Sequence, residues 1–225
     1  MSEHIVSSYD EQLKTLHATV LKMGALCESQ FSNSITALIK GDDELVDKII
    51  GKDDRIDELE KKIDDQVENL ITLRAPMAID LRETVSAMRI ASELERIGDL
   101  AKNIAKRSKI IKGSIDINIS ALIKSTAELV QINLKKTLDS YSKNDEKLAL
   151  SVWNSDKEID IMINKLLQGL MSNIKKEKKN IEVFSHLLFI AKNIERIGDH
   201  ATNICEHIYF LVKGEDIQGN RPKSS

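Results

Sequence analysis

The sequence predicts an all-α protein built from two tandem, pseudo-symmetric three-helix bundles with six long helices. Three observations predict this fold. The 225 residues include only two prolines and nine glycines, with 31% charged and 4% aromatic residues, which is typical of long helices and not of sheets. Apolar residues recur at spacings of three and four along six stretches. A ten-residue segment of the first half also recurs in the second half, which indicates a duplicated unit.

Three helices are expected in the first half, over residues 5–39, 43–73 and 76–112. Asp42 and Asp43 are candidates for the N-cap of the second helix. Pro76 suits the first turn of the third helix, where no intrahelical bond needs its N–H, and Gly113 ends that helix. The apolar positions that repeat every seven residues along the second helix are Ile49, Ile56, Ile63 and Leu70. The apolar stripe of the third helix consists of Ala87, Ile90, Leu94, Ile97, Ala101 and Ile104.

The second half predicts three more helices, over residues 117–141 and 145–174 and in a final stretch that Gly214 closes, with a polar turn at residues 176–180. The apolar stripe of the final helix consists of Leu187, Ile190, Ile194, Ile197, Ala201, Ile204 and Ile208. We therefore expect a first repeat over residues 1–113, a second over residues 114–214 and a disordered tail over residues 215–225.

The third and sixth helices contain the repeated segment. Residues 95–104 recur 100 positions later as residues 195–204, with eight of ten residues identical. The second and fifth helices match more weakly, residues 53–57 against residues 156–160. Both matches fit a duplicated three-helix unit.

Each repeat places two pairs of carboxylates at a spacing of four residues, so that each pair shares one face of its helix. In antiparallel helices, residues equidistant from the turn lie level. The midpoint between the two pairs falls at Pro76 in the first repeat and within residues 176–180 in the second. Four carboxylates are thus expected at one height in each bundle, as a site for a hard cation with oxygen ligands such as magnesium, manganese, calcium or iron, and not for zinc. The candidate ligands are Asp53, Asp57, Glu95, Asp99, Asp156, Asp160, Glu195 and Asp199.

The acidic pattern has two other interpretations, a solvated acidic face or carboxylates paired with Lys and Arg from a neighbouring helix. Gly98 and Gly198 each cost their helix ~1 kcal/mol relative to Ala, and indicate close approach by either another helix or a bound ion. Asn103 and Asn203 lie one turn further along and offer carbonyl oxygens. His200 corresponds to Leu100 in the first repeat and is not expected to be a ligand that the two sites share.

Charge, apolar runs, cysteines and missing motifs argue against several classes of protein. The net charge of −3 shows no nucleic-acid signature, although residues 42–68 carry 12 acidic against 5 basic side chains, a net −7. No apolar run reaches the ~18 residues that a membrane span needs, and no secretory signal is recognisable at the N-terminus, so we expect a cytoplasmic protein. Cys27 and Cys205 are too isolated for a disulfide framework and are expected to be buried apolar residues. No phosphate-binding loop or nucleophile–base arrangement is present, so we do not expect an enzyme.

The two copies of Glu-Arg-Ile-Gly-Asp-x-Ala-x-Asn-Ile, together with the Ala-Pro-Met-Ala-Ile-Asp-Leu-Arg segment at residues 75–82, resemble the PhoU family of phosphate-transport regulators over residues 5–212. The resemblance implies metal clusters, multinuclear iron in some members, on the eight carboxylates named above. It also implies a negative regulator of phosphate uptake and phosphate-starvation signalling. Its partners would be the ATPase subunit of the phosphate ABC transporter and a phosphate-sensor histidine kinase, so that the protein reaches the membrane only through them.

A homodimer is also expected. Two other function classes remain open from the sequence. One is a metalloenzyme with a carboxylate-bridged metal centre on a helical bundle, and the other is a metal-free helical scaffold whose acidic faces bind a basic partner.

Overall fold

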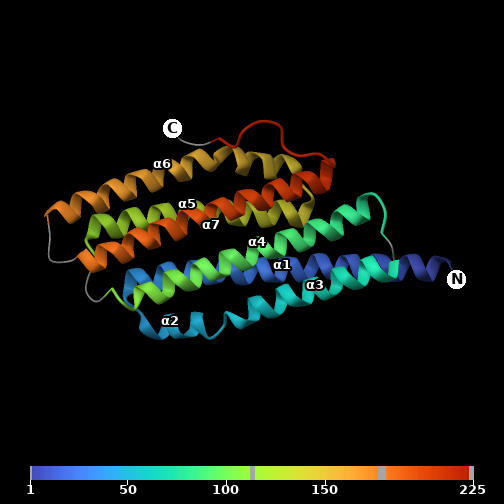
Figure 1. Ribbon diagram of the computed structural model, residues 1–225, viewed down its shortest axis with the longest axis horizontal. Helices are drawn as coiled ribbons and strands as arrows, with labels where there is room; N and C mark the ends of the chain where they lie inside the picture. The colour runs from blue at the N-terminus through green and yellow to red at the C-terminus, as the bar shows by residue number, and fades with distance from the viewer. Residues whose placement is uncertain (1, 75, 112–114, 177–180, 223–225) are drawn as a thin grey trace.

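The computed structural model describes residues 2–74, 76–111, 115–176 and 181–222, and these residues form helices joined by short connections (Figure 1). The helices are α1 (Ser2–Lys40), α2 (Asp43–Ile50), α3 (Asp54–Arg74), α4 (Ile79–Ser108), α5 (Ile117–Lys143), α6 (Glu146–Lys176) and α7 (Ile181–Lys213). The predicted all-α class and its tandem repeat are confirmed.

Two three-helix bundles lie side by side. The first contains α1, α4 and the α2–α3 pair, and the second contains α5, α6 and α7. The bundles pack through α4 against α7 and α1 against α5, so α3 and α6 lie on opposite outer sides of the molecule (Figure 1). The two predicted apolar stripes, along α4 and α7, are buried. Most buried apolar residues of both bundles form one continuous core, which makes the repeats a single packed body.

The predicted second helix is interrupted at residues 51–53, and this break separates α2 from α3. The Lys52 N–H bonds back to the Ile49 carbonyl three residues away at 3.2 Å, a tighter spacing than an α-helix uses. Gly51 favours an end to the helix here because glycine is a poor helix former. Ile49 and Ile56 are nevertheless both buried on the predicted apolar face. The break places Asp53 immediately before the first turn of α3.

Aspartates cap several helices as their sequence positions suggest. Asp42 is the N-cap of α2 and accepts a hydrogen bond from the Leu45 N–H at 2.9 Å. In the same way, Asp116 caps α5 and Asp145 accepts from the first turn of α6. Pro76 precedes α4 and does not lie in its first turn, since that helix begins at Ile79.

The predicted ends of some elements differ from the structure or fall outside it. The third predicted helix ends at Ser108. Gly113 lies outside the described residues, as does most of the predicted polar turn, residues 177–180.

The C-terminal tail was expected to be disordered over residues 215–225, and its described part, residues 215–222, contains no helix or strand. Gly214 ends α7 with a left-handed backbone (φ +76°), a conformation that glycine adopts without steric cost. The chain then turns back and passes over α6 (Figure 1). Residues 223–225 lie outside the described residues.

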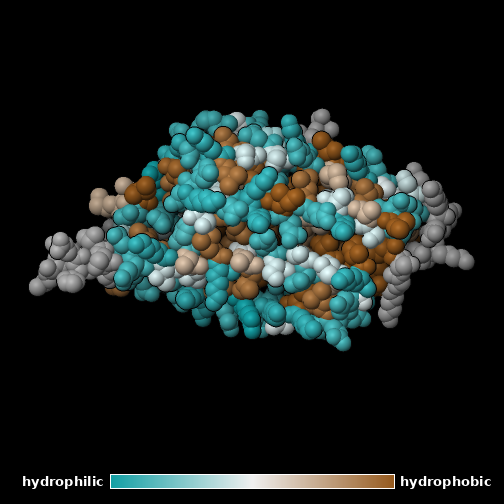
Figure 2. All heavy atoms as spheres, turned by 180° about the vertical axis from the view of Figure 1, so that it is seen from behind, coloured by the Kyte–Doolittle hydropathy of each residue, from teal (hydrophilic) through white to brown (hydrophobic). Residues whose placement is uncertain are grey.

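The surface is mixed in character. On the face shown in Figure 2, hydrophobic side chains occur in small groups among hydrophilic ones, which is normal for a protein surface. Among the described residues, no helix is long and apolar enough to cross a membrane. Cys27 and Cys205 are buried and free, as expected.

Candidate functional site: two acidic clusters

The first acidic cluster lies where the start of α3 packs against α4. Asp53 is only 5% exposed, and its carboxylate forms an ion pair with the Lys102 ammonium. The same ammonium lies 2.7 Å from Asp99 Oδ1. Lys102 therefore bridges a carboxylate of the α2–α3 break to one of α4. The prediction that carboxylates of these two helices lie level is confirmed for this pair.

Gln30 of α1 bonds to the Asp53 carboxylate oxygen that Lys102 does not contact. Its Nε2 donates to Asp53 Oδ1 at 2.9 Å and to the Gly98 carbonyl at 3.0 Å. One amide thus joins α1 to the start of α3 and to α4. Asp53 also lies just before the N-terminus of α3, where the helix dipole favours a negative charge. These contacts together allow a charged side chain to stay buried.

The charges of this cluster are coupled. Burial alone would lower the pKa of Lys102, but its bonds to Asp53 and Asp99 outweigh burial and raise that pKa well above its usual range. Burial, followed by the charge of Asp53, raises the pKa of Asp57, and Lys102 opposes this effect. Burial, followed by the charge of Asp99, raises the pKa of Glu95. One ammonium therefore does not fully compensate the four predicted carboxylates.

The second acidic cluster joins α6, α7 and the C-terminal tail. Asp156 is 3% exposed, although it lies in the middle of α6. The Arg221 guanidinium donates to both of its oxygens, from Nε to Oδ2 at 2.7 Å and from Nη2 to Oδ1 at 2.9 Å. The same Nη2 donates to Asp199 Oδ1 at 2.8 Å. Here too, a basic side chain brings together one carboxylate from each of the two predicted pairs.

Neighbouring polar groups complete this second cluster. The Thr202 hydroxyl lies 3.1 Å from both Asp156 Oδ1 and the Gly198 carbonyl, and its single proton serves one of them at a time. Glu195 pairs with Lys192 at 2.5 Å, one turn earlier on the same helix. Asp160 is half-buried on α6. The second cluster is thus compensated by an arginine that is distant in sequence.

Gly98 and Gly198 make room for another helix. A Cβ added at Gly98 would lie 2.9 Å from Ile56 Cδ1, and one at Gly198 would lie 3.0 Å from Ile159 Cδ1. Ile56 and Ile159 are equivalent residues of α3 and α6, each three positions after the buried aspartate. Of the two explanations that the sequence left open, close helix packing therefore accounts for both glycines.

The carboxylates have the chemistry that a hard cation needs but not the arrangement. Oxygen donors suit magnesium, manganese or iron, and Lys102 and Arg221 stand where such a cation would be attracted. Within the described residues, however, no three acidic, histidine or cysteine side chains are placed to hold one ion. As the clusters stand, they do not fit a metal, because a basic side chain occupies the meeting point of each buried pair.

Other side chains considered as ligands lie elsewhere. Asn103 is exposed. Asn203 donates to Glu93 at 3.2 Å, and His200 Nδ1 lies 2.6 Å from the same carboxylate. Burial would raise the pKa of Glu93, but these hydrogen bonds and the nearby histidines lower it. These residues join α4 to α7 across the boundary between the two bundles, outside both acidic clusters.

Sequence reasoning named the acids but missed Lys102, Arg221 and Gln30. Lys102 was detectable, because it lies three residues after Asp99 on the same helix face. Arg221 gave no periodic signal, since it lies beyond the last helix. Gln30 is 23 residues from its partner and on another helix, so no local pattern pointed to it.

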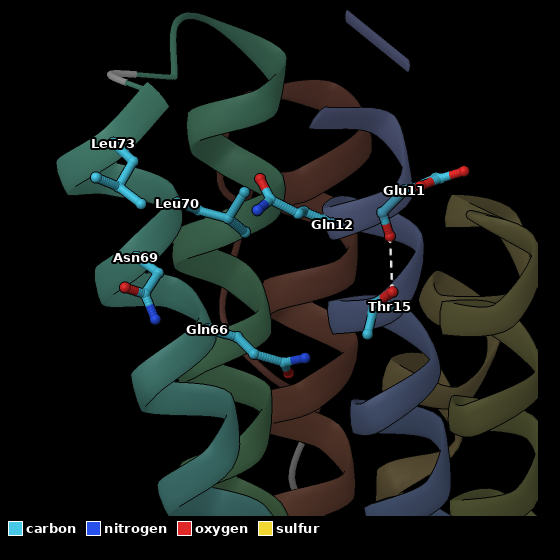
Figure 3. A pocket seen from close by; sticks show the side chains of 7 residues that line it. All are labelled: Glu11, Gln12, Thr15, Gln66, Asn69, Leu70 and Leu73. Carbon is cyan, nitrogen blue, oxygen red and sulfur yellow. Dashed lines mark hydrogen bonds between the residues drawn. The ribbon is translucent and has the colours of Figure 1, made fainter. Parts of the chain in front are cut away.

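A hollow of about 400 Å³ between α1 and α3 offers a second candidate site (Figure 3). The residues that line it are Glu11, Gln12, Thr15, Gln66, Asn69, Leu70 and Leu73. It contains a single carboxylate, and the Thr15 hydroxyl donates to the Glu11 backbone carbonyl at 2.7 Å. None of the predicted ligands lines this hollow, so the acidic clusters are the stronger candidate.

Comparison with known proteins places the whole chain in one family. The PhoU domain family matches twice, over residues 20–108 and 123–208. The chain is 42% identical to the phosphate-specific transport system accessory protein PhoU homolog of Caulobacter vibrioides, covering 99% of this chain and 97% of that protein. It is equally similar, at 42%, to the homolog of Rhizobium meliloti, covering 98% and 93%.

Solved structures agree with the sequence relatives. PhoU from Pseudomonas aeruginosa superposes with a TM-score of 0.88 at 30% identity, covering 92% of this chain and all of that one. The phosphate transport system regulatory protein PhoU from Streptococcus pneumoniae gives 0.86 at 27% identity, covering 93% and 99%. The paired repeats, the two three-helix bundles and these matches over nearly the whole chain lead to one conclusion: the chain belongs to the PhoU family.

Proposed function

We propose that this protein is an accessory and regulatory protein of phosphate-specific transport, which restrains phosphate uptake and phosphate-starvation signalling. The observation that carries the proposal is the match of both repeats, over nearly the whole length, to relatives named as accessory and regulatory proteins of that system. The chain acts by binding and not by catalysis. We also propose that the protein is cytoplasmic and forms a homodimer.

The proposed partners are the ATPase subunit of the phosphate ABC transporter and the phosphate-sensor histidine kinase. Supporting this, α2 and α3 lie on an outer side of the molecule and expose much of the net −7 charge of residues 42–68. Carboxylates of this exposed face include Asp43, Glu44, Asp54, Glu58 and Asp65. Such a surface speeds encounter with a basic partner, and the effect weakens as salt screens it.

Metal binding by the eight carboxylates stays a prediction. Lys102 and Arg221 favour the metal-free scaffold, since each already neutralises a buried aspartate. If metal is nevertheless bound, Glu95→Ala with Asp99→Ala should remove it from the first bundle and leave the second occupied. Elemental analysis of protein purified without chelators measures this. An unchanged metal content in the double variant would contradict the assignment of these two ligands.

A genetic experiment tests the proposed function. Deleting the gene should leave phosphate-starvation genes active in phosphate-rich medium, and the wild-type chain should silence them again. Normal repression in the deletion strain would contradict the proposal.

Binding assays test the proposed partners. The purified protein should bind the transporter ATPase or the sensor kinase, with an association rate that falls as salt rises. The matched variant carries Asp54→Asn and Glu58→Gln on the exposed face of α3, which should slow association without altering the fold. If neither partner binds the wild-type protein, the partner assignment is wrong.

A further inference from the structure

The C-terminal tail ends at a charged contact that the helical bundle alone does not provide. Arg221 lies on a segment with no secondary structure, yet its side chain is only 17% exposed. It contributes three hydrogen bonds, two to Asp156 and one to Asp199. A surface arginine on a free tail would have no reason to be buried in this way.

The repeat explains why this contact is needed. Position 102 of the first bundle corresponds to position 202 of the second. The first bundle has a lysine there, which neutralises Asp53 from within α4. The second bundle has Thr202, whose neutral hydroxyl cannot compensate a charge. Asp156 is therefore as buried as Asp53 but lacks a cation on its own helices at that position, and the tail supplies it.

The tail is held at two further points. At Gly214 the backbone has φ +76°, a conformation that favours glycine, and the Arg82 guanidinium lies against it. Ile217 packs, partly buried, against the main core. Between these anchors and Arg221 the chain is exposed. The segment that lies over α6 thus begins with a turn at Gly214, is anchored by the apolar side chain of Ile217 and ends at the charged contact of Arg221.

The contact selects for a guanidinium. Two parallel N–H donors match the two oxygens of Asp156, and one of these nitrogens also reaches Asp199. A lysine ammonium is a point charge without this fork. Lys102 is fixed on a helix, whereas Arg221 lies on a segment without secondary structure, so it can leave without the unfolding of a helix.

We propose that residues 214–222 form a releasable strap, and that Asp156 and Asp199 form a guanidinium-binding site that Arg221 of the same chain occupies. The strap closes the second acidic cluster and leaves the first unaffected. Release of the strap exposes the carboxylates of α6 and α7 to solvent and to other cationic groups. This inference does not depend on the proposed role in phosphate regulation.

Hydrogen exchange of the full-length chain, followed by mass spectrometry, tests the strap directly. Amides of residues 215–221 should be protected in the wild-type protein, and Pro222 has no amide hydrogen to exchange. Arg221→Ala should increase their exchange rates by about tenfold or more, because local opening then costs little. Arg221→Lys should give intermediate protection. Asn220→Ala, an exposed position in the same tail, is the matched control and should change nothing. Equal protection in wild-type and Arg221→Ala protein, or none in the wild type, overturns the proposal.

Two further measurements distinguish a specific guanidinium site from charge screening, and a contact within one chain from a contact between two copies. Free L-arginine should release the strap at a lower concentration than L-lysine at equal ionic strength. Equal release by both would show simple charge screening and overturn the guanidinium site. Protection should also be independent of protein concentration. Protection that disappears on dilution would mean that the tail comes from a second copy, which overturns the assignment to the same chain.

Discussion

The two bundles carry the same acidic motif on α4 and α7, but different parts of the chain neutralise it. In the first bundle the cation is Lys102, on the same helix as Asp99, and Gln30 adds a hydrogen bond from α1. In the second bundle the cation is Arg221, which arrives from beyond the last helix. The duplication has thus kept the buried aspartate of each repeat, while the group that compensates it differs in origin and in freedom to move.

The backbone around the two buried aspartates differs as well. Asp53 follows the break between α2 and α3, whereas Asp156 lies inside the uninterrupted α6. The helix dipole therefore assists the charge of Asp53 and does little for Asp156, which is far from either end of its helix. The charge of Asp53 is therefore supported by its helix as well as by Lys102, whereas the charge of Asp156 is supported by the side chains of Arg221 and Thr202.

The largest expected effect comes from removing the fixed cation. Lys102→Met leaves Asp53 buried and unpaired, and such a loss costs about 3–5 kcal/mol in a fully buried pair. Arg221→Met should cost less, because its tail can leave and admit water to Asp156. Urea denaturation of both variants measures the difference. Equal losses would mean that the two cations are held with equal rigidity, which would contradict a fixed lysine and a releasable arginine.

Replacing Gly98 or Gly198 by alanine should cause a smaller loss of stability, and the size of the loss should differ between the two bundles. Gly98→Ala places a Cβ 2.9 Å from Ile56 Cδ1, a tighter contact than the 3.0 Å at Gly198. Overpacking costs about 1–3 kcal/mol, partly offset by the ~1 kcal/mol that alanine gains in a helix. Gly98→Ala should therefore destabilise slightly more than Gly198→Ala. Adding Ile56→Val, which removes the contacting methyl, should reduce the loss at Gly98 in the same denaturation assay.

The mildest expected effect is a loss of stability in acid, caused by protonation of buried histidines at the boundary between the two bundles. His17 of α1 stacks on Tyr141 of α5 with ring centroids 4.4 Å apart, and burial lowers the pKa of His17. Burial likewise lowers the pKa of His207, although Glu93 opposes this. Both folded-state pKa values lie below the ordinary value of about 6.5, so the unfolded chain binds more protons. Stability contributed by the neutral rings is then lost as pH falls below about 6.5.

Melting temperatures between pH 7.5 and pH 5 measure this loss. His17→Phe preserves the stacking on Tyr141 but cannot titrate, so the melting temperature of this variant should fall less over the same range. A variant as pH-sensitive as the wild type would show that His17 does not contribute.

Much of the fold was predictable from the sequence, because the buried stripes of α4 and α7 repeat at helical spacing and the two copies confirm each other. The level placement of Asp53 with Asp99 followed from the position of the turn between their helices. The break at residues 51–53 was harder to predict, since Ile49 and Ile56 continue the same seven-residue period across it. Arg221 could not be predicted, because a long-range contact from a segment without periodicity leaves no local pattern.

The most direct test of the account is a pair of double-mutant cycles measured in a chelating buffer. The first combines Asp53→Asn with Lys102→Met, and the second combines Asp156→Asn with Arg221→Met. If each cation compensates its buried aspartate, the free energies of unfolding should be non-additive in both cycles, with coupling of about 1 kcal/mol or more. Coupling near zero in either cycle would contradict the claim that the chain itself neutralises that cluster.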